Sequence, residues 1–374
     1  MLERELGILI RKYLFKKKTI IIYGARQVGK TTLVEQLVGD SNEKTLFLNG
    51  DDADIRTRLS NLSATQLKPI IADHKIVVVD EAQRIPEVGL VLKLIHDNYK
   101  EVQLIATGSS AFELAGKIKE PMTGRKYEFF LQPFSFNEMV NHHGFLTEKR
   151  LLEHRLIFGY YPDITLNTGQ EIKLLKSLAS SYLYKDLLNL DHIQKPVLLE
   201  KILQALALQI GQEVSYNELA QLLNSDKGTI EKYIDLLEKT YIIFRLNGLN
   251  RNVRNEIKKG KKFYFFDNGI RNAVISNFLP LTSRMDTGAL WENYIISERY
   301  KYMINKDIDF NRYFWRTTQQ QEIDYIEEIQ GLFYAYEFKW NPLRKSFLSK
   351  TFANAYPNSE FQVVNPDNMH LFLT

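Results

Sequence analysis

The first third of the chain alternates short apolar runs with amphipathic segments. Apolar runs of strand length occupy Thr19–Tyr23, Thr45–Asn49 and residues 76–79 and 102–106. Helical periodicity follows the first of these runs at residues 31–38. Short apolar strands separated by helices are typical of a parallel sheet that is buried on both faces. We therefore predict an α/β fold for this part, with helices on both faces of the sheet.

After residue 134 the pattern becomes mainly helical. Apolar side chains at helical spacing mark three later segments, residues 198–210, 217–223 and 228–239. Ser215 is a plausible N-cap for the second of these, because Glu218 follows three residues later as in a capping box. A β-like run then extends to residue 246. Two helices joined by a short turn and followed by a strand predict a winged helix-turn-helix.

The last hundred residues mix helix and strand again. Strand-like runs occur at residues 263–266, 322–326 and 332–340, and a helix is expected at residues 286–302. The sequence thus predicts four parts: an α/β domain at residues 1–140, a helical connector at 141–195, a winged-helix domain at 196–262 and a small α/β domain at 263–374.

Composition narrows the class of protein. The chain has 374 residues, of which 44% are hydrophobic and 25% charged; these values are near globular averages and exclude wholesale disorder. It has no cysteine, which excludes disulfides and thiolate metal sites. No apolar run approaches the ~18 residues that a membrane span needs. We expect a cytoplasmic protein with no membrane partner.

The strongest motif directly follows the first strand and directly precedes a helix. It is Gly24-Ala25-Arg26-Gln27-Val28-Gly29-Lys30-Thr31, which matches the P-loop pattern in the context that this pattern requires. Backbone N–H groups of such a loop converge on phosphates at a helix N-terminus. Lys30 would reach the β- and γ-phosphates, and the Thr31 hydroxyl would ligate Mg²⁺. The sequence therefore predicts ATP and Mg²⁺ as cofactors, with the nucleotide bound by Gly24, Ala25, Arg26, Gln27, Val28, Gly29, Lys30, Thr31, Thr32 and Thr107.

Three further positions would complete a phosphoryl-transfer site. Asp80 and Glu81 end an apolar strand about 50 residues after the loop, where Asp80 would hold Mg²⁺ and Glu81 would orient or deprotonate the attacking water. Thr107 ends the next strand and would sense the γ-phosphate, although Thr-Gly-Ser-Ser is also ordinary turn chemistry. Arg125 would supply positive charge in its own subunit or a neighbouring one; an ordinary surface arginine is the alternative.

Several of these motifs together resemble one protein family. The P-loop, Asp80-Glu81-Ala82-Gln83, Thr107-Gly108-Ser109-Ser110 and Thr123-Gly124-Arg125 are similar to motifs of prokaryotic AAA-superfamily ATPases. The segments around Asp267 and Trp291 resemble the companion C-terminal domain of unknown function in that family. The resemblance covers most of the chain from about residue 20 to about residue 340, and it implies an ATPase.

A charged constellation lies near the C-terminus. Glu322 and Asp324 share one face of a predicted strand, and Glu337 and Lys339 share one face of the next. This pattern resembles restriction-endonuclease-like nucleases. The resemblance implies that Asp324 and Glu337 bind Mg²⁺, that Lys339 activates the attacking water, and that Glu292 is an additional acid. A solvated charged strand face, or a nuclease-like fold without cleavage, remains the alternative.

The basic charge is concentrated in one segment. The whole chain has a net charge of +4, whereas residues 245–262 contain one acid, Glu256, and seven basic residues: Arg245, Arg251, Arg254, Lys258, Lys259, Lys261 and Lys262. Such a segment after a helix-turn-helix would contact DNA or RNA phosphates. Four acids within residues 225–240 make the preceding helix poorly suited to a DNA groove, so a solvent-exposed basic hairpin is the alternative.

These observations predict an ATPase whose nucleotide state controls a C-terminal winged-helix and nuclease-like module acting on or near nucleic acid. The alternative is a nucleotide-gated protein-interaction switch without nuclease or DNA-binding activity. The sequence leaves the oligomeric state open.

Overall fold

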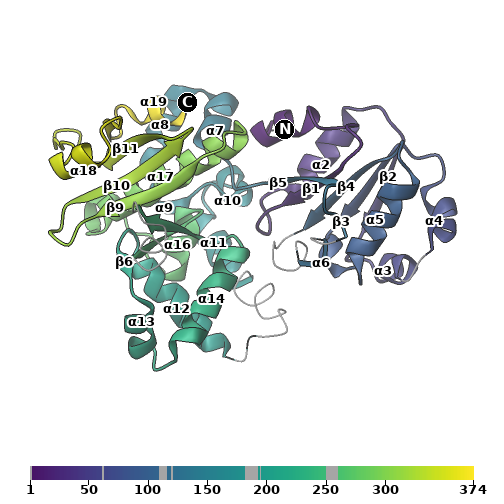
Figure 1. Cartoon of the computed structure of the whole chain (residues 1–374), viewed down its shortest axis with the longest axis horizontal. Helices are drawn as coiled ribbons and strands as arrows, with labels where there is room; N and C mark the ends of the chain where they lie inside the picture. The colour runs from purple at the N-terminus through teal and green to yellow at the C-terminus, as the bar shows by residue number, and fades with distance from the viewer. Residues whose placement is uncertain are drawn as a thin grey trace. The chain divides into compact units, whose positions relative to one another are not determined.

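The computed structural model describes residues 2–60, 63–108, 116–118, 121–181, 193, 195–249 and 260–374. The chain forms two compact units (Figure 1). Unit 1 comprises Met1–Phe134 and Lys239–Tyr241, and unit 2 comprises Ser135–Glu238 and Ile242–Thr374. No helix within the described residues is both long and apolar enough to cross a membrane.

Unit 1 is built on a five-stranded sheet in the order β2-β3-β4-β1-β5. Its strands are β1 (Thr19–Tyr23), β2 (Thr45–Asn49), β3 (Ile76–Asp80), β4 (Gln103–Gly108) and β5 (Lys126–Phe130). All neighbouring strands pair in parallel, so their carboxyl ends lie at one edge of the sheet and their amino ends at the other. The predicted parallel α/β sheet is thus confirmed, with β5 as an additional edge strand.

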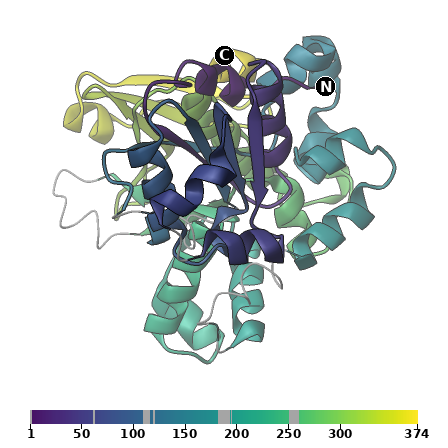
Figure 2. The ribbon, with the colours of Figure 1, turned by 90° about the vertical axis from the view of Figure 1, so that its right-hand side faces the viewer.

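Helices enclose this sheet (Figure 2). They are α1 (Glu5–Arg11), α2 (Lys30–Gly39), α3 (Ala53–Leu59), α4 (Ala64–Ile71), η1 (Ala82–Arg84), α5 (Val88–Asn98) and α6 (Gly116–Ile118). Every residue of β1 is buried, which requires cover on both faces. Alternate strand residues such as Ile21 and Val79 join apolar residues of α3, α4 and α5 in one hydrophobic core, because successive side chains of a strand point to opposite faces.

Unit 2 begins with helices. These are α7 (Phe136–His143), α8 (Phe145–Arg150), α9 (Leu152–Phe158), α10 (Pro162–Leu166), α11 (Glu171–Ser181), α12 (Pro196–Leu208), α13 (Tyr216–Leu222) and α14 (Lys227–Lys239). Ser215 caps α13 by accepting the backbone N–H of Glu218, as the sequence predicts. Figure 1 shows α12, α13 and α14 lying together. Later come α16 (Asn268–Val274), η4 (Leu281–Ser283), α17 (Thr287–Asn305), α18 (Lys350–Ala355) and α19 (Met369–Leu373).

A mixed seven-stranded sheet organises the rest of unit 2, in the order β12-β11-β10-β9-β7-β8-β6. The strands are β6 (Glu213–Val214), β7 (Ile243–Gly248), β8 (Lys261–Phe265), β9 (Asn311–Arg316), β10 (Glu322–Ile329), β11 (Leu332–Phe338) and β12 (Glu360–Val364). The boundary predicted between residues 262 and 263 falls inside β8. Because β7 pairs with both β8 and β9, the segments predicted as separate domains contribute strands to one continuous sheet.

Candidate functional site

The phosphate loop connects the carboxyl end of β1 to the first turn of α2. Gly29, the residue before α2, has a φ of 92°, a backbone conformation that residues other than glycine rarely adopt. Gly24 lies so close to the neighbouring chain that an added Cβ would be 2.3 Å from the carbonyl oxygen of Leu131. The two glycines of the motif are therefore required by the local geometry.

Lys30 begins α2, and its side chain is buried inside the loop. Its Nζ donates hydrogen bonds of 3.0 Å to the carbonyl oxygens of Gly24 and Ala25. The ammonium is thus held where a loop-bound polyphosphate would lie, at the positive end of a helix. Thr32 and Gln27, which the sequence also assigns to nucleotide binding, are exposed at the same loop.

Strand ends bring Thr31, Asp80 and Thr107 together. The Thr31 hydroxyl donates to Asp80 Oδ2 across 2.9 Å, and the Thr107 hydroxyl donates to the other carboxylate oxygen of Asp80. The backbone N–H of Glu81 donates to Thr107 Oγ1 at 3.2 Å. These contacts form because β4 lies between β1 and β3 in the sheet. The structure thus joins four of the predicted site residues; Ser109 and Ser110 of the same motif lie outside the described residues.

Glu81 sits in a constrained turn after β3. Its backbone is left-handed, with φ 47° and ψ 42°, which costs a residue with a side chain about 1 kcal/mol or more. Gln83 Nε2 donates to Glu81 Oε2 at 2.6 Å, so the carboxylate is held in position. Gly50 packs against this turn: its N–H donates to the Asp80 carbonyl at 2.8 Å, and an added Cβ would be 2.4 Å from the Glu81 carbonyl oxygen.

The oxygen atoms of Thr31 and Asp80 fit Mg²⁺. Mg²⁺ is a hard cation that binds through one or two protein oxygens together with substrate phosphates and water. Within the part of the chain that the structure describes, no group of three or more His, Asp or Glu side chains is arranged to hold a metal ion. The P-loop site does not need such a group, because most Mg²⁺ ligands there come from the nucleotide and from water.

Arg4 is a residue of this site that sequence reasoning missed. The residue is 6% exposed, and its guanidinium donates to the carbonyl oxygens of Val28, at 2.8 Å, and Gln132, at 2.5 Å. It also lies 4.8 Å from the centre of the Phe134 ring. Arg4 thus ties the phosphate loop to the segment that ends unit 1. Nothing in the local pattern before α1 indicates this contact, which joins residues distant in sequence.

Arg125 lies away from the phosphate loop of its own chain. It precedes Lys126, which pairs with Thr19 at the start of β1, so Arg125 is at the amino edge of the sheet and the loop is at the carboxyl edge. Its Nε donates to Asp97 Oδ1 at 2.8 Å. The structure therefore does not bring Arg125 to the γ-phosphate position within one chain, because the length of β1 separates them.

The predicted C-terminal residues do meet, in one charged cluster within unit 2. Lys339 Nζ pairs with Glu337 Oε2 at 2.6 Å, and Asp324 Oδ2 accepts the backbone N–H of Phe338 at 2.9 Å. Burial raises the pKa of Asp324 and of Glu337. It also raises the pKa of Glu292 to about 7, against the opposing effect of the Lys262 ammonium.

Lys262 is the cation at the centre of this cluster. It is 1% exposed, and its Nζ lies 2.6 Å from Glu322 Oε1 and 3.5 Å from Glu292 Oε1. The Tyr264 hydroxyl donates to the same oxygen of Glu292 at 2.6 Å. A lysine therefore neutralises the acids here, and the absence of a three-ligand metal group among the described residues gives the implied Mg²⁺ site of Asp324 and Glu337 no support.

The basic segment at residues 245–262 is only partly available to a polyanion. Lys262 is buried, and Arg245 pairs with Glu238 and, at 2.7 Å, with Asp235. The prediction of a phosphate contact is therefore wrong for Lys262, which is buried against Glu292 and Glu322. For Arg245, whose side chain is 23% exposed, it stays a prediction, although two carboxylates already pair with this guanidinium. Four other basic residues of the segment lie outside the described residues: Arg251, Arg254, Lys258 and Lys259.

Family models divide the chain into three segments. Residues 16–140 match an AAA domain, residues 149–281 match a domain of unknown function (DUF8612), and residues 287–370 match a second domain of unknown function (DUF4143). The second match extends across the predicted boundary between residues 262 and 263.

The chain is similar to uncharacterized proteins of several organisms. It is 26% identical to one of Mycobacterium tuberculosis over 341 residues, which cover 90% of this chain and 74% of that protein. A Methanocaldococcus jannaschii protein is 24% identical over 330 residues, covering 78% of this chain and 69% of the other. A Haemophilus influenzae protein is 23% identical over 276 residues, or 68% of each chain.

Among solved structures, a mutant of Thermotoga maritima RuvB aligns with a TM-score of 0.34 and 15% identity, covering 64% of this chain and 88% of that one. The Pif1 helicase from Candida albicans aligns with a TM-score of 0.27 and 14% identity, covering 42% of this chain and 48% of that one. The P-loop geometry and the family match at residues 16–140 agree: this chain carries an AAA-family P-loop ATPase domain, followed by two domains of unknown function.

Proposed function

We propose that this protein binds ATP with Mg²⁺ at the Gly24–Thr31 loop, hydrolyses it, and uses the nucleotide state to control a module in unit 2 that acts on or near nucleic acid. The observation that carries the ATPase proposal is the convergence of Lys30, Thr31 and Asp80 at the carboxyl edge of a parallel sheet. A lysine, a hydroxyl and a carboxylate in this order are the groups that P-loop enzymes use.

Each residue has a distinct task in this proposal. Lys30 exchanges its two loop carbonyl partners for phosphate oxygens and offsets the charge that develops on them. Glu81 accepts a proton from the attacking water or orients it, and the hydrogen bond from Gln83 fixes the direction of its carboxylate. Thr31 and Asp80 would hold Mg²⁺, which supplies charge neutralisation at the β- and γ-phosphates when it is bound.

Two variants test the ATPase. Lys30→Ala should lose ATP binding, measured by isothermal titration, and Glu81→Gln should bind ATP but release phosphate at a strongly reduced rate. Glu87→Gln is a matched control, because Glu87 is an exposed glutamate with the same left-handed φ of 47°; it should hydrolyse ATP normally. Wild-type affinity in Lys30→Ala, or normal turnover in Glu81→Gln, would refute the corresponding assignment.

Arg125 can serve this reaction only from a neighbouring subunit, because it lies at the opposite edge of its own sheet. Mixing Arg125→Ala, which retains an intact P-loop, with the Lys30→Ala protein, which retains Arg125, should then restore part of the lost hydrolysis. If the mixture is no more active than the sum of its parts, Arg125 acts as the structural partner of Asp97 alone.

The action of unit 2 needs its own test. Cleavage of DNA and RNA should be measured with Mg²⁺ or Mn²⁺, with and without ATP, in wild type and Glu337→Ala. Cleavage that depends on Glu337 would support a nuclease. The internal pairing of Arg245 and Lys262 favours the second candidate, a nucleotide-gated protein-interaction switch, and no cleavage under any condition would support that candidate.

A further inference from the structure

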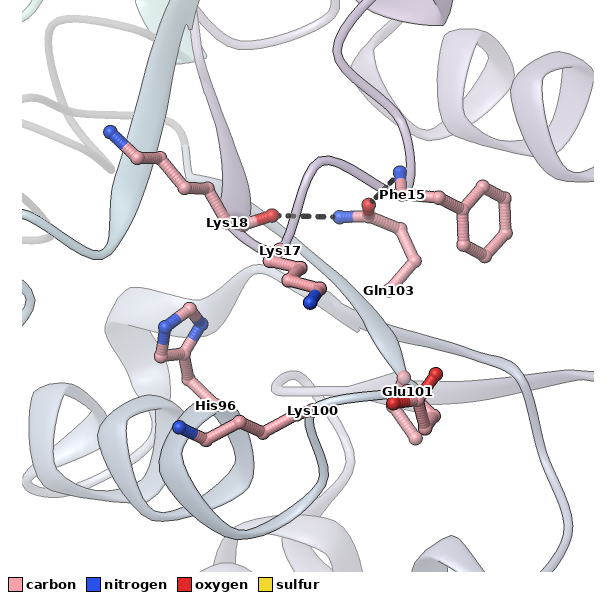
Figure 3. Close-up of a pocket in the computed structure, with 8 residues that line it drawn as sticks. Phe15, Lys17, Lys18, His96, Lys100, Glu101 and Gln103 are labelled. Carbon is pink, nitrogen blue, oxygen red and sulfur yellow. Dashed lines mark hydrogen bonds between the residues drawn. The ribbon is translucent and has the colours of Figure 1, made fainter.

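A small basic pocket lies in unit 1 at the amino edge of the sheet, away from the phosphate loop (Figure 3). It encloses about 210 Å³ and is formed by the loop before β1, the end of α5 and the start of β4. Its lining residues are Phe15, Lys17, Lys18, His96, Lys100, Glu101, Val102 and Gln103. Because the pocket and the P-loop lie at opposite edges of one sheet, both can be occupied at the same time.

The loop that forms one wall is held in a fixed conformation. The buried Gln103 side chain accepts the backbone N–H of Phe15 at 2.5 Å and donates to the Lys18 carbonyl at 3.1 Å. Phe15 and Lys17 have positive φ angles of 56° and 58°, so the loop turns sharply at both. These bonds preorganise the wall, which reduces the entropy lost when a ligand binds.

The charge of the pocket is positive. Three lysines and one glutamate line it, and neither Lys17 nor Lys100 forms an ion pair with another described residue. Figure 3 shows Lys17, Lys100 and His96 around the pocket, with Lys18 directed away; Lys18 Nζ lies 4.7 Å from the Tyr127 ring centre. Two ammonium groups are therefore available to an anion.

His96 adds a polar group to the same wall. Its Nδ1 lies 3.2 Å from the Thr19 hydroxyl, which leaves the other ring nitrogen for a ligand. Burial lowers the pKa of His96, and the Arg125 and Lys100 cations lower it further against the opposing effect of Asp97. The imidazole is therefore neutral at neutral pH, and it can donate or accept a hydrogen bond without adding to the charge.

Phe15 also lines the pocket, and Figure 3 shows its ring directed outward, away from Lys17 and Lys100. Phe15 is 48% exposed and is followed directly by Lys16, Lys17 and Lys18. The pocket volume is below the roughly 300 Å³ at which sites for complete cofactors begin, so it suits one small anionic group rather than a whole dinucleotide. An aromatic platform next to lysines is the combination that binds single-stranded nucleic acid, with bases stacked on rings and phosphates on cations.

We propose that this pocket docks a single strand of nucleic acid, with a backbone phosphate between Lys17 and Lys100 and an adjacent base stacked on Phe15. A single strand fits better than a duplex, because stacking on Phe15 requires a base that is not stacked within a helix. This docking site rests on one part of the proposed function, namely that the protein acts on or near nucleic acid. It moves the docking surface from residues 245–262 to the AAA domain.

The role of the two lysines is tested with a fluorescent oligothymidylate strand of about 20 nucleotides and the full chain. Fluorescence anisotropy measures the binding affinity at salt concentrations between about 50 and 200 mM. The double variant Lys17→Ala/Lys100→Ala should bind about tenfold or more weakly, and its plot of log affinity against log salt should be shallower by about 0.7, because one phosphate contact is lost. The matched control is Lys16→Ala/Lys68→Ala, which removes two exposed lysines of unit 1 that do not line the pocket. It should bind nearly as wild type does.

The ring is tested separately. Phe15→Ala should weaken binding about fivefold or more without changing the salt dependence, because stacking releases no counterions. Phe47→Ala is the control, since Phe47 is 46% exposed on β2 of the same unit and lies outside the pocket. ATP affinity should be unchanged in all four variants, which shows that unit 1 is folded.

Three results would overturn the inference. If wild type binds strand and both pocket variants bind as their controls do, the docking site is elsewhere and the proposed function is unaffected. If unlabelled duplex competes as strongly as single strand, a base on Phe15 is excluded. If wild type binds no nucleic acid while still hydrolysing ATP, this inference and the nucleic-acid part of the proposed function both fail, and the ATPase part stands.

Discussion

The Thr31 hydroxyl donates a 2.9 Å hydrogen bond to the Asp80 carboxylate, and this contact joins the first turn of α2 to the end of β3. The second oxygen of the same carboxylate accepts from Thr107 on β4. Asp80 is therefore oriented by hydroxyl groups from two different elements.

Thr107 should matter for turnover more than for nucleotide affinity. In Thr107→Val the Asp80 carboxylate loses one of its two hydroxyl donors, and we expect phosphate release to slow about 10- to 100-fold, with ATP affinity within about threefold of wild type. Thr107→Ser keeps the hydroxyl and should retain most activity. Equal loss in the Ser and Val variants would mean that the methyl group, and not the hydrogen bond, is required.

Arg4 should determine how well the phosphate loop is formed. Arg4→Ala leaves the Val28 and Gln132 carbonyls without their guanidinium donor, and unpaired buried carbonyls cost about 1–3 kcal/mol. We expect ATP to bind about tenfold more weakly, measured by titration. Arg11→Ala, at the end of α1, removes exposed ion pairs with Glu3 and Asp40 and should leave ATP affinity unchanged. A similar loss in both variants would contradict a specific role for Arg4.

Lys262 should be required for the stability of unit 2. Lys262→Met removes the buried ammonium that neutralises Glu292 and Glu322, and breaking such a buried group destabilises by about 3–5 kcal/mol. The neighbouring Lys261 lies 4.5 Å from the Tyr216 ring centre, so Lys261→Met should cost about 1 kcal/mol or less. Urea unfolding, followed by a spectroscopic signal from unit 2, measures the loss of stability in each variant. Equal urea midpoints for Lys262→Met and Lys261→Met would indicate that Lys262 is not a structural cation.

The stability of unit 2 should depend on Asp286 in a pH-specific way. Although burial favours its neutral form, hydrogen bonds from Arg284, at 2.8 Å, and Arg271, at 2.6 Å, lower the pKa of Asp286 to about 2. A carboxylate whose pKa is lower in the folded chain stabilises the fold at pH values above its unfolded pKa of 3.8. That contribution to the free energy of unfolding is lost as the pH falls through the pKa of the folded chain.

Asp286→Asn should therefore lower the unfolding free energy by about 3 kcal/mol between about pH 5 and 7. The difference in unfolding free energy between wild type and variant should narrow below about pH 4. In this range the wild-type carboxylate takes up a proton more readily in the unfolded chain than in the folded one. Chemical denaturation at several pH values measures this difference, with the exposed Asp309→Asn as the control. A gap that is constant down to about pH 3 would show that charge on Asp286 contributes nothing.

Much of unit 1 could be predicted because its signals are local. Each of these signals is a contiguous stretch of sequence: the apolar runs of β1 and β3, and the P-loop between β1 and α2. Parallel pairing then brings the ends of β3 and β4 to the edge that carries the loop. The strand order, with β4 between β1 and β3, completes the meeting of Asp80 and Thr107 with Thr31.

The roles of charged residues could not be predicted in the same way. Lys262 and Arg245 look like members of a basic surface when they are counted along the chain, yet Lys262 is a buried counter-ion and Arg245 pairs with Asp235 and Glu238. Arg125 follows the phosphate motifs in sequence but lies at the far edge of the sheet. Side-chain charge is visible in a sequence, whereas the partner that neutralises it is not.

The sequence by itself determined the P-loop, the parallel sheet and which acids share a face within β10 and within β11, because these depend on residue type, periodicity and short-range spacing. Only the tertiary structure decided that Arg4 closes the phosphate loop, that Lys262 balances the C-terminal acids, and that Lys17 and Lys100 meet at one pocket. These contacts join residues far apart in the chain, and their strength depends on burial and on distance, which only the folded chain fixes.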